Sequence, residues 1–282
     1  MKELEEFLKF SGVSMSAVAR AIGVSAGALS QFRKGLYHGD NKTLEAKINS
    51  YIANYNAKSE NAIKKDEVFI SLDYKMANFI IKEAVSEREI ALIYGVAGTG
   101  KTTILKEFER THANAILIEV TPHTNARVLL EDLCEALKIQ TPKGLRAMLR
   151  AVARYLANAD KILLIDEAEH LPLRALEDLR RIADFSRVPL ILCGTEILLR
   201  NLMGKNKELR QLYSRICGKH MMKGLSKAES KEFFGDYIYD FARENFRSSA
   251  KLYKKAVRLA ELNNKQISRE IVEKATSMVV LG

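Results

Sequence analysis

The sequence predicts an α/β fold, in which a largely parallel sheet is followed by a helical lid and preceded by a small all-α domain. Three apolar runs, within EIALIYG, KILLIDE and VPLILCG, predict the sheet, because each ends in small or acidic residues and helical patterns separate them. Residues 1–56 instead contain short helical patterns with apolar side chains at Val18, Ile22, Leu29 and Phe32.

The composition is that of a folded chain with room for about two domains. With 282 residues, of which 47% are hydrophobic and 28% charged, disorder over most of the length is excluded. The three cysteines stand far apart without CxxC spacing, which indicates neither a disulfide framework nor a zinc site. Neither a signal peptide nor an apolar run of about 18 residues occurs, so we expect a cytoplasmic protein that does not cross a membrane.

The net charge of +10 favours a polyanionic partner, although a basic excess also serves solubility. Its distribution is uneven. Residues 1–56 contain 7 Lys and Arg against 5 Asp and Glu, whereas residues 214–282 contain 14 against 8. The C-terminal quarter is therefore the more basic end.

Residues 15–35, MSAVARAIGVSAGALSQFRKG, are typical of two short helices joined by a turn. Gly23 permits the turn, and the Ser25 hydroxyl can cap the second helix. This pattern resembles the repressor-like helix-turn-helix family over residues 1–56. The positions left exposed suit a helix in a DNA major groove, and the candidate DNA contacts are Ser25, Ser30, Gln31, Arg33 and Lys34. A helical module for protein contacts is the alternative, which the near-neutral charge of this segment keeps open.

The run EIALIYGVAGTGKTTILKEF places a GxxxxGK[ST] motif, residues 95–102, between an apolar strand and a helical pattern. Glycines let backbone N–H groups approach nucleotide phosphates, Lys101 places a positive charge beside the outer phosphates, and Thr102 offers a hydroxyl to Mg²⁺. The expected ATP-binding residues are Gly95, Val96, Ala97, Gly98, Thr99, Gly100, Lys101, Thr102, Thr103 and Asp166.

A second motif, KILLIDEAEH, ends an apolar strand in Asp166 and Glu167. Asp166 at the strand end can hold Mg²⁺ together with Thr102, and Glu167 can polarise an attacking water. The sequence therefore predicts hydrolysis of ATP as well as binding. For His170, which Glu169 separates from the DEA triplet, we expect a structural or surface role.

Two further polar residues follow apolar segments. Thr195 ends VPLILCGT, where it either contacts the attacking water or serves as a turn residue. Arg215, in ELRQLYSRI, either reaches the γ-phosphate of a neighbouring copy as an arginine finger or forms a surface salt bridge. The residues alone leave both pairs of alternatives open.

The order of these motifs resembles that of the AAA+ ATPases over residues 66–282. The resemblance implies a core at 66–225 and a lid at 226–282. The start of the lid is marked by a predicted Ser226–Glu229 capping box, and the polar segment 57–65, which lacks periodicity, is expected to be a linker. The resemblance also implies that Thr195 is the sensor-1 residue, Arg215 the arginine finger and Arg247 the sensor-2 residue. The glycines usual before that last arginine are replaced by Glu244 and Asn245.

The N-terminal module, the DEAEHL sequence and the short basic lid together resemble the phage Mu B transposition protein family. That resemblance implies an ATPase that binds double-stranded DNA without strong sequence preference and assembles helical filaments on it in the bacterial cytoplasm. It further implies delivery of target DNA to a DDE transposase, which the protein stimulates and which prompts hydrolysis and disassembly.

Two basic segments are candidates for the DNA contact in this part of the chain. Lys251, Lys254, Lys255 and Arg258 fall at i, i+3, i+4 and i+7 and form one stripe on a helix, for which a solvated face is the alternative. The second segment supplies Arg127, Lys143, Arg146 and Arg150. No series of aromatic residues in these segments marks a platform for stacking nucleic-acid bases, so contact with a duplex backbone is favoured over stacking on single strands.

Two other functions share these motifs. One is a helix-turn-helix repressor whose ATPase core controls oligomerisation, and the other is a replication initiator or helicase loader. A repressor is expected to concentrate basic charge in its reading head, and an initiator to carry a DNA-reading module after the lid. The charge distribution and the end of the chain soon after Glu273 both favour the transposition protein.

Overall fold

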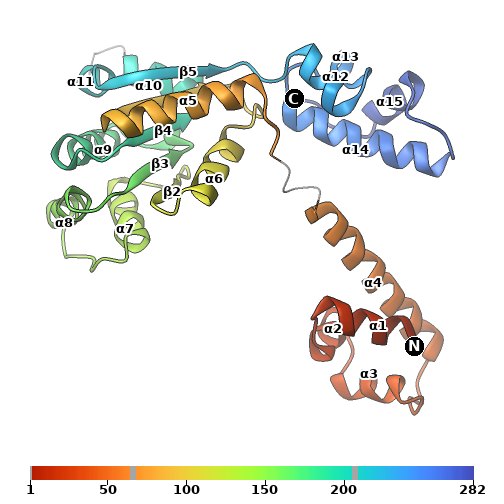
Figure 1. Cartoon of the computed structure of the whole chain (residues 1–282). Helices are drawn as coiled ribbons and strands as arrows, with labels where there is room; N and C mark the ends of the chain where they lie inside the picture. Colours follow the sequence, from red (N-terminus) through yellow and green to blue (C-terminus); the bar gives the residue numbers. More distant parts are fainter. Residues whose placement is uncertain (1, 64–67, 205–208) are drawn as a thin grey trace. The chain divides into compact units, whose positions relative to one another are not determined.

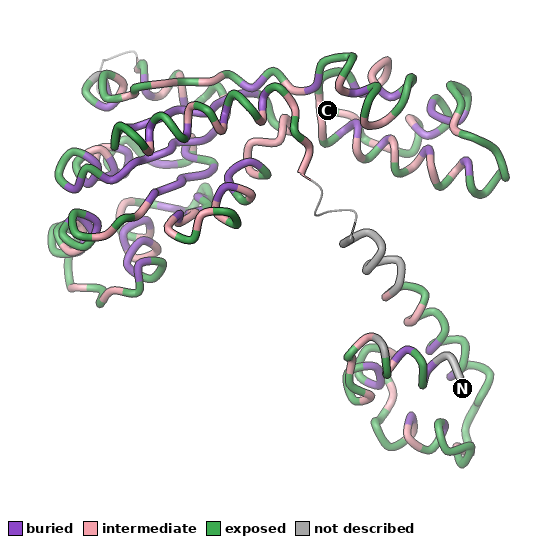
Figure 2. Tube along the Cα trace, in the orientation of Figure 1, coloured by how far each residue is buried: buried purple, intermediate pink, exposed green. Residues whose placement is uncertain are grey.

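The computed structural model describes residues 2–63, 68–204 and 209–282 (Figure 1). The chain divides into two compact units, Met1–Val68 and Phe69–Gly282. Buried residues lie along the strands of the sheet and on the inner faces of the helices (Figure 2).

The N-terminal unit is all-α, as predicted, and packs around an apolar core of its own. Its helices are α1 (Lys2–Ser11), α2 (Met15–Ala21), α3 (Ala26–Arg33) and α4 (Asn41–Ile63). Leu4 and Phe7 of α1 and Leu44 and Ile48 of α4 are buried three and four positions apart, so each helix turns one apolar face inward.

The turn between α2 and α3 has the local geometry that the sequence predicts. Gly23 has φ +72°, a left-handed conformation that L side chains rarely adopt. The Ser25 hydroxyl accepts the Ala28 N–H at 3.0 Å and caps α3. Leu29 and Phe32 are buried on the inner face of that helix.

The predicted linker at 57–65 differs from the structure over most of its length, because α4 continues to Ile63. Alanine, lysine and glutamate are good helix formers, so a polar sequence without apolar periodicity still extends a helix that has begun. The remaining linker positions, 64 and 65, lie outside the described residues.

The second unit is built on a parallel sheet with strand order β2-β3-β4-β1-β5, and this confirms the predicted α/β fold (Figure 1). The strands are β1 (Ile90–Gly95), β2 (Ala115–Glu119), β3 (Ile162–Asp166), β4 (Leu190–Gly194) and β5 (Ile216–Met222). Ile90 pairs with both Leu190 and Ile216, so these strands begin level with one another.

Helices cover both faces of the sheet, because successive side chains of a strand point to opposite faces. Ala91 and Ile93 of β1 pack with one set of helices, and Leu92 packs with the other. One face carries α5 (Leu72–Glu87) and α6 (Lys101–Thr111). The other carries α7 (Ala126–Ala136), α8 (Leu145–Ala157), α9 (Leu173–Ser186) and α10 (Glu196–Met203).

The lid follows β5 and has a separate apolar core. Its helices are α12 (Lys227–Phe234), α13 (Ile238–Ala242), α14 (Phe246–Leu262) and α15 (Arg269–Thr276). The predicted capping box is present, since Ser226 accepts the Glu229 N–H and the Glu229 carboxylate accepts the Ser226 N–H at 2.8 Å. The other Glu229 oxygen accepts the Leu72 N–H at 2.7 Å, so this residue also ties the lid to the first helix of the core.

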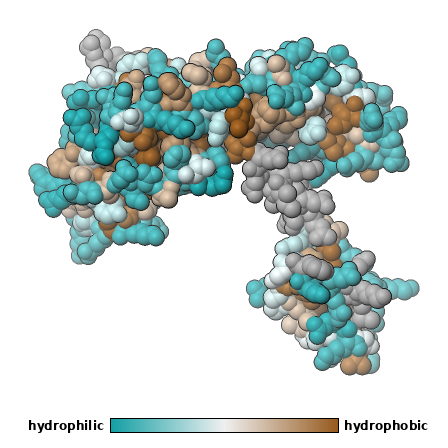
Figure 3. All heavy atoms as spheres, in the orientation of Figure 1, coloured by the Kyte–Doolittle hydropathy of each residue, from teal (hydrophilic) through white to brown (hydrophobic). Residues whose placement is uncertain are grey.

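None of the described helices is long and apolar enough to cross a membrane. The face drawn in Figure 3 is mainly hydrophilic, with apolar side chains in small separate patches.

Candidate active site

The phosphate-binding loop leaves β1 at Gly95 and enters α6 at Lys101, as the motif predicts. Two of its glycines, Gly95 and Gly98, are favoured by space as well as by conformation. Gly98 has φ +88°, and a Cβ there would lie 2.5 Å from the Asn245 side-chain oxygen. A Cβ on Gly95 would lie 2.4 Å from the Met222 carbonyl oxygen. The loop backbone therefore runs so close to Met222 and Asn245 that a side chain at either glycine would collide with them.

The N-terminus of α6 supplies the features that bind an anion. Gly100 is the N-cap and carries no capping side chain, so the first N–H groups of the helix stay available and its positive dipole end faces the loop. The Lys101 ammonium donates to the carbonyl oxygens of Gly95 and Val96 at 2.8 and 2.9 Å. This cradle of N–H groups and one ammonium fits the triphosphate of ATP.

Asp166 and Glu167 lie at the carboxyl end of β3, in different surroundings. Asp166 is 2% exposed, and one of its oxygens accepts the Glu167 N–H at 3.0 Å. Burial raises the pKa of the neighbouring Cys193 thiol well above its usual value, and the Asp166 carboxylate acts in the same direction. The thiol is therefore neutral. The Asp166 carboxylate and the Thr102 hydroxyl are hard oxygen donors, which fit Mg²⁺.

Glu167 has a left-handed backbone, with φ +55°, although it is not glycine. Such a conformation costs about 1–3 kcal/mol and is common at active sites. The side chain is 58% exposed, and its carboxylate lies 3.9 Å from His170 Nε2. The turn thus presents a carboxylate to solvent beside the buried Asp166, and His170 lies on the surface as predicted.

Thr195 follows β4, which lies between β3 and β1 in the sheet. Its hydroxyl accepts the Ile197 N–H at 3.4 Å and caps α10. The sheet order therefore places Thr195 between the strand of Asp166 and the strand of the phosphate-binding loop.

The lid touches the phosphate-binding loop through the first turn of α14. The Asn245 amide donates to the Ala97 carbonyl at 3.1 Å, while its oxygen accepts the Ser248 N–H and caps the helix. The Arg247 N–H donates to the Gly98 carbonyl at 3.1 Å, and the Arg247 side chain is exposed. Asn245 was noticed in the sequence as a replaced glycine, but that pattern did not predict its contact with the loop.

Arg215 is the predicted site residue that the structure places apart from the others. It precedes β5, and Ile216 pairs with Ile90 at the start of β1. The phosphate-binding loop begins at the other end of β1, roughly 16 Å away at the rise of a β-strand. Arg215 therefore does not serve the nucleotide site of its own chain, and its guanidinium forms an ion pair with Asp184 at 3.3 Å.

Glu169 is a residue near the site that sequence reasoning assigned no role. One of its carboxylate oxygens is buried without a hydrogen-bond partner among the described residues. The same oxygen would lie 2.3 Å from a Cβ on Gly194, so it faces the end of β4. Its position two residues after Glu167 was the available signal.

The candidate DNA contacts lie on three separate surfaces, and nearly all are exposed. In the N-terminal unit they lie on α3 and at its two ends, and among them only Ser30 is half-buried. In the core, Arg127 pairs with Glu131 at 3.4 Å, whereas Arg150 lines a groove of about 780 Å³ between α8 and α9. Lys143 and Arg146 are exposed near the start of α8. On α14, three of the four basic side chains are exposed and Lys255 is half-buried.

Known proteins similar to this chain include an AAA domain family and two phage-type transposition proteins. The AAA domain family matches residues 83–203. The DNA transposition protein B of the Mu-like prophage FluMu of Haemophilus influenzae is 26% identical over 236 residues, which cover 82% of each chain. The ATP-dependent target DNA activator B of Escherichia phage Mu is 29% identical over 221 residues, which cover 76% of this chain and 70% of that protein.

Among solved structures, the ORC2 protein of Aeropyrum pernix, in ADPNP and ADP complexes, matches with a TM-score of 0.57 at 16% identity. The match covers 76% of this chain and 69% of that chain. It supports the same fold for the second unit.

Proposed function

We propose that ATP controls the assembly of this ATPase on double-stranded target DNA. The proposal is supported by the match of residues 83–203 to the AAA domain family and by the 26% and 29% identity to two transposition proteins B. The assembled protein forms helical filaments without strong sequence preference, delivers the DNA to a DDE transposase and stimulates it. ATP hydrolysis then releases the DNA.

One observation carries the proposal. The phosphate-binding loop is hydrogen-bonded to the first turn of α14 through Asn245 and Arg247, and α14 is the helix with the basic stripe. A change in the loop when nucleotide binds or leaves therefore moves a helix whose other turns present lysines to solvent. This gives the nucleotide a direct route to the DNA-binding surface.

Each residue of the site has a separate role in ATP hydrolysis. Lys101 and the N–H groups of α6 hold the phosphates, and Thr102 and Asp166 hold Mg²⁺, which when bound neutralises charge on the phosphate oxygens. Glu167 accepts a proton from the attacking water, and Thr195 orients that water. Arg247 contacts the phosphates from the lid, and Arg215 reaches the nucleotide of the next copy in the filament.

We assign the DNA contact first to the stripe on α14, at Lys251, Lys254, Lys255 and Arg258. The basic residues of the core, Arg127, Lys143, Arg146 and Arg150, form the second surface. The N-terminal unit adds an auxiliary contact through α3. Contacts to phosphate give affinity without sequence preference, which suits a protein that presents many different target sequences.

The test is negative-stain electron microscopy of the full chain with random-sequence duplex DNA, in ATP and in ADP. We expect continuous filaments in ATP and none in ADP. Discrete particles, or binding that is the same in both nucleotides, would contradict the proposal.

A matched pair of variants tests the DNA surface. Reversing Lys251 and Lys254 to Glu should weaken DNA binding and reduce the slope of log affinity against log salt by about 0.9 for each lost phosphate contact. The control reverses Lys227 and Lys265, which are also exposed on the lid but lie outside the stripe. Equal losses in both variants would show that only net charge matters.

The compact N-terminal unit supports a second candidate function. Its capped α3 presents Gln31 and Arg33 to solvent, as a helix that reads operator DNA does. In that case the protein is a repressor whose oligomerisation depends on nucleotide. Selection of bound sequences from a random DNA pool decides, since a repressor enriches one motif and a target activator enriches none.

A further inference from the structure

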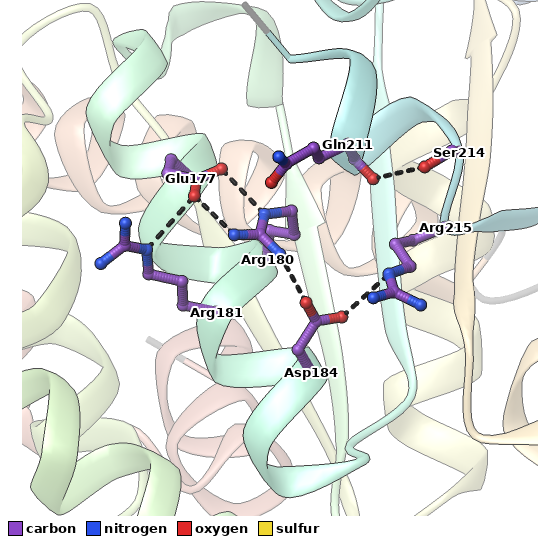
Figure 4. A network of polar contacts seen from close by, with 7 residues as sticks. All are labelled: Glu177, Arg180, Arg181, Asp184, Gln211, Ser214 and Arg215. Carbon is purple, nitrogen blue, oxygen red and sulfur yellow. Dashed lines mark hydrogen bonds and ion pairs between the residues drawn. The ribbon is translucent and has the colours of Figure 1, made fainter.

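Arg215 belongs to a chain of ion pairs along α9 (Figure 4). Its Nε lies 3.3 Å from one oxygen of Asp184, and the other Asp184 oxygen accepts a hydrogen bond from Arg180. Arg180 in turn donates to both oxygens of Glu177, at 2.9 and 2.6 Å. Asp184 is therefore held from both sides, once by its own helix and once by Arg215.

The ion pairs within α9 hold the side chains of Arg180 and Asp184 in place. Glu177, Arg180 and Asp184 are spaced i, i+3 and i+7, which places them along one side of α9. The Arg180 side chain is largely buried, and the hydrogen bonds from Arg180 hold the pKa of Glu177 below its usual value. Glu177 also receives a hydrogen bond from Arg181 at 3.2 Å. A carboxylate in this network has little freedom to follow a mobile partner.

The Arg215 side chain is joined to Asp184 alone among the described residues. Asp184 lies 3.3 Å from Nε, and no ion pair or hydrogen bond joins the guanidinium to any other described residue (Figure 4). The side chain is 59% exposed. A guanidinium has five N–H donors, so one that is mostly exposed and paired with a single carboxylate keeps donors for a phosphate.

We propose that Asp184 is a positioning residue for catalysis between copies, which holds Arg215 with its terminal nitrogens presented to the nucleotide of the neighbouring copy. This inference rests on the proposed function of Arg215. An exposed arginine without a partner samples many rotamers, and orientation before the encounter removes that entropic cost from the reaction. Asp184 itself touches no nucleotide.

Asp184→Asn keeps the volume of the side chain and removes its charge. We expect kcat for ATP hydrolysis on duplex DNA to fall on the order of 10-fold, while KM for ATP stays unchanged, because the reacting groups of each chain are intact. Asp184→Glu retains the charge and should retain more than half of the wild-type kcat. The control is Asp178→Asn on the same helix, for which we expect no change.

Mixed assemblies separate positioning from a general structural defect. Glu167→Gln copies bind ATP without hydrolysing it and carry an intact Arg215 and Asp184. Added in excess to Asp184→Asn copies, they should restore kcat per active site, because each active site then receives its arginine from an intact neighbour. Arg215→Ala copies should be restored in the same way.

The outcomes are distinct. If Arg215→Ala alone hydrolyses ATP at the wild-type rate, the proposed role of Arg215 fails, and the role of Asp184 fails with it. If Arg215→Ala is slow and is restored by mixing while Asp184→Asn matches the wild type, only the inference about Asp184 is overturned. The inference is also overturned if Asp184→Asn is slow and mixing does not restore it, since the defect then lies within its own chain.

Discussion

The two ends of the sheet hold their candidate functional residues in different ways. At the carboxyl ends of the strands, the site is shaped by the backbone: left-handed residues such as Gly98 and Glu167, the N-terminus of α6 and main-chain carbonyls that receive bonds from the lid. At the amino ends, Arg215 is held by side chains, through Asp184 and Arg180. Backbone conformations are specified locally, whereas the ion pairs depend on how separate elements pack.

The largest effect is expected from the substitution that removes the one side-chain charge of the phosphate-binding loop. Lys101→Ala should lower kcat/KM for ATP by about 10³-fold, because a charge-assisted contact to the reacting phosphate is lost, and nucleotide-dependent DNA binding should disappear. The measurement is ATPase activity together with DNA binding in ATP. The control is Arg110→Ala in the last turn of the same helix, whose guanidinium pairs with Glu107. Unchanged DNA affinity would show that the nucleotide is not the switch.

Glu167→Gln tests the other half of the carboxyl-end site. We expect kcat to fall by about 10²-fold or more, because the water loses its base, while ATP still binds. DNA complexes formed in ATP should then outlast those of the wild type after dilution into competitor DNA. The control is Glu196→Gln, an exposed carboxylate in the first turn of α10. Equal lifetimes would remove Glu167 from the role of base.

Gly98→Ala probes the contact between the loop and the lid. The new Cβ would collide with the Asn245 side chain, and the alanine would have to keep a left-handed φ, at a cost of about 1–3 kcal/mol. We therefore expect ATP to bind about 10-fold more weakly, as measured by calorimetry. Gly144→Ala is a matched control, since its φ is +95° but nothing lies within 4 Å of its Cβ. Addition of Asn245→Ala should restore part of the loss if the collision causes it. No restoration would leave backbone strain as the only cause.

The comparison of the two ends also explains what the sequence could predict. The phosphate-binding loop and the Asp166–Glu167 pair were recognisable because each is a short motif that carries its own backbone context. The edge strand β5 was not singled out, because its burial alternates and Lys219 and His220 interrupt any apolar run. The segment 57–63, predicted as part of a linker, is helical, since helix propensity extends α4 to Ile63.

The contacts of Asn245 and Asp184 could not be predicted for a different reason. Asn245 lies more than one hundred positions from Ala97, and Asp184 lies about thirty from Arg215, so no local spacing links them. Only the packing of the lid against the loop, and of α9 beside the start of β5, brings these groups together. The sequence indicated which groups were polar, and the fold determined their partners.

The smallest expected effect lies at the amino end, in the anchor of the ion-pair chain. Glu177→Gln should destabilise the protein at pH 7 by less than about 1 kcal/mol, because the pair is partly exposed. Arg180 lowers the pKa of Glu177 in the folded chain, so this contribution is fully present well above the unfolded pKa of about 4.3 and is lost as pH falls through the lower folded value. The difference between wild type and variant in urea midpoint should therefore be constant from pH 7 to 6 and shrink below pH 5. A difference that keeps its full size at pH 3.5 would mean that packing, and not charge, anchors this end of the sheet.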